Sequence, residues 1–227
     1  MRILLALVLF FCTVLACPSV EAQYLHPKIK EKQVTVRSAV ILPAKVELSK
    51  ESSKGREMMV AESEDASVKI VDAVTQALQE KKISLVPSPY DQKAEPLLEE
   101  RKYTLANIQG RYDALLPKLV DKSKDIKKGR FTLGDEVMVL NVDKSADALI
   151  FIRGQGRVFT KGKTAFSLLN PFNFDFPFLF ISVGIVDVHT GDVLVFTKPV
   201  SATKVLKDPK SLKKLVLKSL KKLPASS

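Results

Sequence analysis

The fold of this chain is decided by one apolar stretch, Phe178-Leu179-Phe180-Ile181-Ser182-Val183-Gly184-Ile185-Val186-Asp187-Val188. In an extended chain the apolar side chains fall on both faces. One face carries Leu179, Ile181, Val183 and Ile185, and the other carries Phe178, Phe180, Val186 and Val188. This pattern predicts a central strand covered on both sides, because a half-exposed strand alternates apolar with polar residues.

Two more strands are predicted beside the central one. The turn His189-Thr190-Gly191-Asp192 supplies a glycine where a short hairpin needs a positive φ, so Val183–Phe196 predicts a hairpin. Ala146–Phe159 predicts a further strand. A Phe-rich insertion over residues 166–180 follows that strand and runs into the central one.

The first part of the chain, Val34–Pro87, has the order strand, helix, strand that is typical of a crossover unit with parallel strands. Its first strand is predicted at Val34–Leu42, with Val46 and Leu48 as an edge extension and Ser49–Gly55 as a loop. The helix and the second strand are predicted at Ser63–Lys82 and Ile83–Pro87.

Residues 91–142 are predicted to be a helical insertion. A helix is expected over Pro96–Leu116, with a kink or a break near Pro117. Asp121–Arg130 reads as a lysine-rich, solvated linker. Thr132–Val142 has signals for both strand and helix, and we take it as a helix.

A lysine-rich amphipathic helix is predicted at the C-terminal end, with Asp208 as its N-cap and Pro209 at its first position. Its apolar stripe is expected to dock on the sheet. The alternative is adhesion of the basic face to anionic lipid. The lysines of that face are Lys210, Lys213, Lys214, Lys218, Lys221 and Lys222.

Together these elements predict an α/β fold in a single domain over residues 34–224. We expect a mixed sheet of about five strands with helices packed on it. The expected order is strand, helix, strand, helix, a second helix within the insertion, three strands and a last helix.

The N-terminus has the pattern of a secretory signal peptide over residues 1–22. Met1-Arg2 precedes the apolar run Ile3–Ala16, and Val20-Glu21-Ala22 is a small-residue cleavage site. Val14-Leu15-Ala16-Cys17 also fits the box at which a bacterial lipoprotein is cut, in which case residues 1–16 are removed and Cys17 is lipidated. Both alternatives predict export.

Residues 23–33 are polar and basic, and we expect them to form a leader or tether. The only cysteines, Cys12 and Cys17, lie in or beside the signal segment. The sequence therefore predicts a domain without a disulfide, a thiol nucleophile or a thiolate metal site.

The chain has 36 basic and 25 acidic residues, a formal net charge of +11. Such a surplus favours anionic partners, namely acidic polymers, phospholipid headgroups or acidic proteins. The predicted export argues against nucleic acid as the partner.

No motif supports catalysis. His189 lies near Asp187 and Asp192, but no second histidine or cysteine of the domain can complete a zinc site, so we expect a plain turn residue. Gly154-Gln155-Gly156 and Lys161-Gly162-Lys163 lack the remaining glycines of nucleotide-binding loops, and we read them as turn or bulge segments. We expect no catalytic, metal or cofactor site.

The second half of the Phe-rich insertion, from Phe172 to Phe180, has a phenylalanine at every second residue, so in an extended chain these rings face one way. These rings either fold back as core or form an aromatic ridge that contacts a partner or a membrane. The candidate contact residues are Phe172, Phe174, Phe176 and Phe178.

Ala146-Asp147-Ala148-Leu149-Ile150 and Val186–Leu194 resemble the Ala-Asp-Ala-Leu and Val-Asp-x-x-Thr-Gly-x-Val-Leu segments of a bacterial envelope superfamily. It includes the curli-secretion channel lipoprotein, the lipoprotein activators of penicillin-binding proteins and the N-terminal domain of the Tol translocation protein. The resemblance implies an α/β sandwich with a mixed sheet and a role in envelope assembly or protein contact. The helical and Phe-rich insertions depart from the family pattern.

The leading expectation is therefore a non-catalytic protein of the periplasm or outer membrane that binds a protein partner or self-associates. A membrane-associating or channel-forming component that uses the Phe-rich segment and the basic surface is the alternative. An enzyme ranks third.

Overall fold

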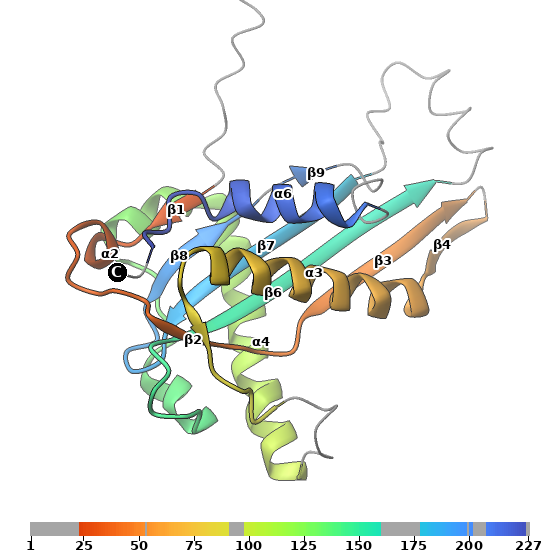
Figure 1. Cartoon of the computed structure of the whole chain (residues 1–227). Coiled ribbons are helices and arrows are strands. Elements are labelled where there is room, and N and C mark those ends of the chain that lie inside the picture. The colour runs from red at the N-terminus through yellow and green to blue at the C-terminus, as the bar shows by residue number, and fades with distance from the viewer. Residues whose placement is uncertain are drawn as a thin grey trace, which may run out of the picture.

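The computed structural model describes residues 23–52, 54–90, 98–159, 178–198, 200–201 and 208–225. They form one mixed sheet with helices on both faces, which confirms the predicted α/β class (Figure 1). The described part of the sheet has nine strands, not about five. The additional strands come from segments read as tether, edge extension or loop, and from a two-residue strand near Val200.

The centre of the sheet is the long antiparallel pair of β6 (Ala148–Phe159) and β7 (Phe178–Asp187). The hairpin to β8 (Val193–Thr197) follows, as predicted. The described side chains of β7 are buried except Phe180, which is partly exposed. The predicted central strand, covered on both sides, is thus confirmed.

The other strands flank this pair, and the sheet order is β1-β8-β7-β6-β2-β5. The predicted parallel crossover is confirmed, since β2 pairs in parallel with both β5 and β6. β3 continues beyond β2 along the second half of β6, and β4 pairs with β3. The bounds are β1 Gln23–Leu25, β2 Ser38–Ile41, β3 Lys45–Ser52, β4 Gly55–Met58, β5 Ser84–Leu85 and β9 Val200–Ser201.

Helices cover the two faces of the sheet differently. On one face α3 (Val60–Glu80) and α6 (Pro209–Ser219) lie side by side (Figure 1). On the other face lie α4 (Glu99–Asp121) and the 3₁₀ helices η1 (Ser123–Lys128) and η2 (Asp135–Leu140). Each group buries its own apolar cluster against the sheet, so the protein has two core layers.

The prediction that residues 23–33 form a tether was wrong. Gln23–Leu25 is strand β1, which pairs antiparallel with β8, and the short helix α2 (Pro27–Lys30) follows. Ile29 is buried in the core, and His26 N donates to Leu194 O at 2.8 Å. A polar composition did not reveal this strand, because its stability comes from backbone bonds to β8.

Two predicted helix features were also wrong. α3 begins at Val60, not near Ser63, whose hydroxyl instead donates to Met59 O at 2.6 Å. Of the kink or break expected near Pro117, the break is wrong, because α4 continues through Pro117 to Asp121. Proline removes one helical bond, but Tyr112 and Leu119 on either side are fully buried and hold this last part of the helix on the sheet.

The segments after α4 are more ordered than the sequence indicated. The predicted linker Asp121–Arg130 contains η1, whose Ile126 is completely buried. Within Thr132–Val142 the helix expectation holds only in part, since Asp135–Leu140 is a 3₁₀ helix and Thr132 bridges to Asp192.

The C-terminal helix agrees with its prediction. The Asp208 side chain accepts from Lys210 N at 3.1 Å, and Pro209 opens α6. The apolar stripe is buried on the sheet face that α3 also covers, at Leu212, Val216, Leu220 and Leu223.

Tyr112 of α4 lies tightly against the central strands. Its ring stacks on Phe151 with centroids 4.3 Å apart, and its fully buried hydroxyl lies over Gly184 of β7. A Cβ placed on Gly184 would collide with the Tyr112 hydroxyl. Glycine at this position therefore permits the close approach of α4 to the sheet.

We expect Gly184→Ala to lower the free energy of unfolding by about 1–3 kcal/mol, because the buried tyrosine cannot move without losing its packing. Urea denaturation measures this. Gly110→Ala is the matched control, since a Cβ on this exposed α4 glycine meets nothing within 4 Å. It should raise stability by up to about 1 kcal/mol. Equal effects of the two changes would contradict the packing argument.

His26 connects the N-terminal segment to the β7–β8 turn and to η1. Its Nδ1 accepts from Lys28 N at 3.2 Å, which caps α2, and its ring lies against Gly129. Lys28 Nζ binds Asp192 at 2.7 Å. Burial lowers the pKa of His26 below its ordinary value, while nearby Asp192 partly opposes this shift.

A lowered pKa in the folded state means that the unfolded chain binds more protons around the unfolded pKa of about 6.5. The contribution of His26 to the free energy of unfolding should therefore be fully present above that pH. It should be lost as the pH falls through the lower folded pKa. Urea midpoints measured from pH 7.5 down to 5 test this. His26→Asn keeps a capping oxygen but does not titrate in this pH range, so the urea midpoint should change less with pH. An unchanged dependence of the midpoint on pH would exclude His26 as its cause.

Candidate functional site

The candidate site is the open edge, which we define as strand β4 together with Ala44–Glu47. All four residues of β4 are exposed. In the part of the chain that the structure describes, β4 pairs only with β3, so its outer side has no strand partner. The prediction of a loop at Ser49–Gly55 missed this hairpin, although Val46 and Leu48 alternate with charged residues as a half-buried strand requires.

Hydrogen bonding shows which backbone groups of β4 face outward. Met59 N donates to Leu48 O at 2.9 Å, just beyond the last register pair, Ser49 and Met58. Pairing alternates along an antiparallel ladder, so the backbone groups of Arg56 and Met58 point away from β3. These are the N–H and C=O groups that another strand can bind.

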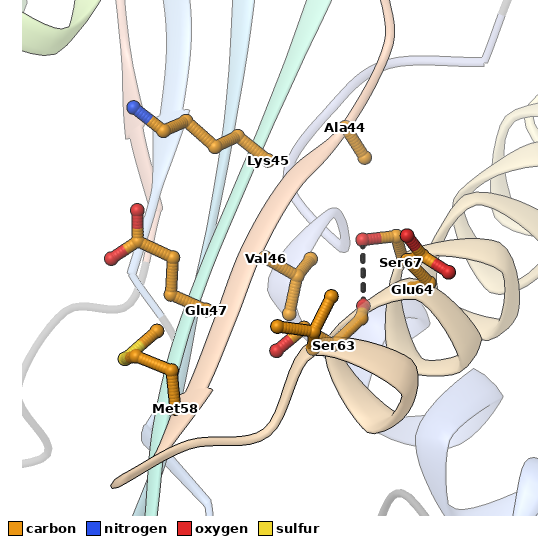
Figure 2. A pocket seen from close by; sticks show the side chains of 9 residues that line it. Ala44, Lys45, Val46, Glu47, Met58, Ser63, Glu64 and Ser67 are labelled. Carbon is orange, nitrogen blue, oxygen red and sulfur yellow. Dashed lines mark hydrogen bonds between the residues drawn. The ribbon is translucent and has the colours of Figure 1, made fainter. Parts of the chain in front are cut away.

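A hollow of about 310 Å³ lies between β3 and the first turns of α3, beside the open edge. Figure 2 shows Val46 pointing toward α3, with Lys45 and Glu47 on the opposite side of the strand. Met58 and Val60, which are 50% and 67% exposed, form part of its apolar lining. The hollow can therefore receive an apolar side chain from a bound segment.

The polar end of this hollow is held by Ser63. Its hydroxyl accepts from Leu48 N at 2.9 Å, and its carbonyl accepts from the Ser67 hydroxyl at 2.9 Å (Figure 2). The first bond connects the edge of β3 to α3 directly, and the second lies within α3. The hollow thus has rigid walls formed by secondary structure.

A second hollow of about 220 Å³ lies on the α4 side of the same stretch of β3. Lys45 and Glu47 line it from β3, and Phe180 lines it from β7. Lys198 Nζ lies 4.8 Å from the centre of the Phe180 ring. The remaining lining residues are Asp113, Leu116, Arg153, Gly154 and Gln155.

Arg153 is the buried charge of this second hollow, and its side chain is only 6% exposed. Its Nε donates to Asp113 at 2.5 Å, and its Nη1 donates to Ile152 O at 3.0 Å. Lys45 Nζ reaches the other Asp113 oxygen at 3.4 Å. The carboxylate therefore holds α4 to both β6 and β3.

Gly154 is part of regular β6, so Gly154-Gln155-Gly156 is neither a turn nor the expected bulge. A Cβ on Gly154 would lie 2.9 Å from Val46 Cγ1. The glycine therefore leaves room for the valine that lines the first hollow. Lys161-Gly162-Lys163 lies outside the described residues.

The other sequence-predicted residues lie away from this site. His189 is an exposed turn residue, as predicted, since Asp187 Oδ1 accepts from both His189 N and Thr190 N. The six lysines belong to α6 or follow it, on the opposite side of the sheet from α4. Cys17, Phe172, Phe174 and Phe176 lie outside the described residues, and Phe178 begins β7.

Within the described ranges, no three His, Cys, Asp or Glu side chains gather as a metal ion would require. None of the helices described has the length and apolar character needed to cross a bilayer. The candidate site itself offers an exposed strand backbone and two hollows.

No family model matches the chain, and no curated protein matches it. Among solved structures it is similar to a PelC dodecamer from Paraburkholderia phytofirmans, at 12% identity and a TM-score of 0.40, covering 90% of this chain and 96% of that one. A single-residue variant of that dodecamer has 12% identity and a TM-score of 0.37, with 90% and 97% covered. TM-scores of this size assign neither a fold family nor a function to this chain.

We expect Asp113→Asn to destabilise the protein by about 1–3 kcal/mol, because Arg153 would remain buried without its counter-charge. Urea denaturation at neutral pH measures the loss. Glu136→Gln is the control, since Glu136 pairs with Arg111 at 2.8 Å on the surface and both side chains are nearly half exposed. The control should leave the urea midpoint unchanged. Equal losses would show that the Arg153 pair is no more important than a surface pair.

Proposed function

We propose that this chain is an exported, non-catalytic protein of the cell envelope that binds an extended segment of a protein partner along its open edge. The N-terminal signal pattern supports export to the periplasm or the outer membrane, with the processed protein either free or anchored through Cys17. The proposal needs no cofactor and no metal.

The observation that carries this proposal is the outer backbone of β4, which pairs with no strand of the described residues. A strand added beside β4 gains hydrogen bonds at Arg56 and Met58. Its alternate side chains can then reach the neighbouring apolar hollow at Met58 and Val60. Main-chain bonds supply affinity and the hollow supplies selectivity.

The charges on β4 favour a partner other than a second β4. A two-fold antiparallel pair centred on Arg56 places arginine opposite arginine, and one centred on Glu57 places glutamate opposite glutamate. Like charges directly opposite each other destabilise a strand pair. A different polypeptide, whose charges complement Arg56 and Glu57, avoids this repulsion.

Site-specific photocrosslinking in the exporting cells tests the proposal, with the crosslinker at Glu57. We expect a discrete adduct with one partner. Arg56→Pro removes an outward-facing N–H, so it should reduce the adduct about tenfold or more, while Arg56→Ala keeps the N–H and most of the adduct.

Thermal unfolding should show that Arg56→Pro still folds, since an outward N–H of an edge strand is not part of the sheet ladder. A crosslinker at Lys122, on the α4 side of the molecule, is the positional control. An adduct that survives in folded Arg56→Pro, or no adduct at Glu57, would exclude strand addition at this edge.

A further inference from the structure

The docked helix α6 and the turn that follows it present a row of exposed lysines. Its buried stripe contains Leu212, Val216 and Leu220. On the opposite side, four exposed lysines follow one another at intervals of four, four and three residues, and we call them the lysine ridge. The ridge consists of Lys210, Lys214, Lys218 and Lys221.

The ridge has few acidic neighbours. None of its four ammonium groups forms an ion pair with a carboxylate of the described residues. Glu80 of α3 is already paired with Lys213 at 2.8 Å, and Asp208 caps the N-terminus of α6. The ridge is therefore an array of exposed positive charge on a rigid support.

The chain enters the folded domain beside the C-terminal end of this ridge. Gln23 Oε1 accepts from Lys222 N at 2.5 Å. Lys81 Nζ donates to Lys221 O at 3.0 Å, which brings the end of α3 and the exposed Lys82 just after it to the same place. β1 and the end of α6 are accordingly neighbours (Figure 1). The N-terminal entry to the domain and the C-terminal end of the ridge, although far apart in sequence, therefore lie at the same end of the molecule.

We propose that the lysine ridge binds the headgroups of an anionic membrane, with the C-terminal end of α6 next to the point where the N-terminal segment leaves the domain. Cys17 is six residues before Gln23. An extended chain of that length spans about 20 Å. A lipid on Cys17 would hold the ridge near the bilayer, and an anchor combined with a basic patch binds more stably than either alone.

The burial of the apolar stripe determines the mode of binding. Leu212, Val216 and Leu220 pack in the core, so α6 cannot insert as an isolated amphipathic helix does. Contact is electrostatic and should weaken as salt rises. The adjacent α3 exposes Asp72 and also Asp65, which pairs with Lys69 at 2.5 Å, so we expect the contact to centre on the side of α6.

Vesicle sedimentation tests this with the protein as processed by the cells that export it. Vesicles of phosphatidylcholine alone are compared with vesicles of equal amounts of phosphatidylcholine and phosphatidylglycerol. The difference in the amount of bound protein measures the electrostatic contribution to binding. We expect a clear preference for the anionic vesicles at low salt. Changing all four ridge lysines to Gln should reduce that preference about tenfold or more.

The matched control changes four exposed lysines of the α4 side to Gln, with the same loss of net charge. These are Lys118, Lys122, Lys124 and Lys144. The control should keep the preference, and circular dichroism should show both variants folded. An equal loss in the control, or an unchanged preference in the ridge variant, would overturn the proposal. So would equally tight binding of soluble polyglutamate, which would assign the ridge to an acidic protein.

Discussion

The structure depends on the antiparallel pair of β6 and β7, which is buried between two helical layers. Its hydrogen-bonded register runs from Ala148 and Asp187 to Arg157 and Phe178. One face receives α3 and α6, and the other receives α4 with the 3₁₀ helices. Because both faces are covered, apolar side chains alternate between two separate cores, and the helices pack against one core or the other.

This arrangement accounts for where the protein can interact. The described side chains of β7 are largely buried, and the proposed partner contact lies at the strands beyond β6. The hairpin of β3 and β4 extends the sheet outward and ends with an exposed strand. The lysine ridge lies on α6, on the face opposite α4, where a docked helix must keep its outer side polar. The proposed strand addition and the proposed lipid contact therefore involve different surfaces, so one does not block the other.

Parts of the candidate site could have been predicted from the sequence, and parts could not. Alternation at Val46 and Leu48 was sufficient to indicate a half-buried strand, but a loop was expected to follow at Ser49–Gly55. The α4 contribution, in which Asp113 binds Arg153, has no local signal because its residues are 40 positions apart. Burial of a charge is decided by its surroundings, and these exist only in the folded chain.

The sequence by itself determined the central hairpin and the docking of α6. Two-sided apolarity, a turn glycine and a capped amphipathic stripe are local patterns whose physical consequence is the same in almost any fold. Tertiary structure alone decided that Gln23–Leu25 joins the sheet, that α4 continues through Pro117 and that the N-terminal entry meets the lysine ridge. Short strands and helices that contain proline are stabilised by neighbours distant in sequence, through backbone hydrogen bonds and packing. These contacts produce no hydrophobic periodicity in the segment's own sequence.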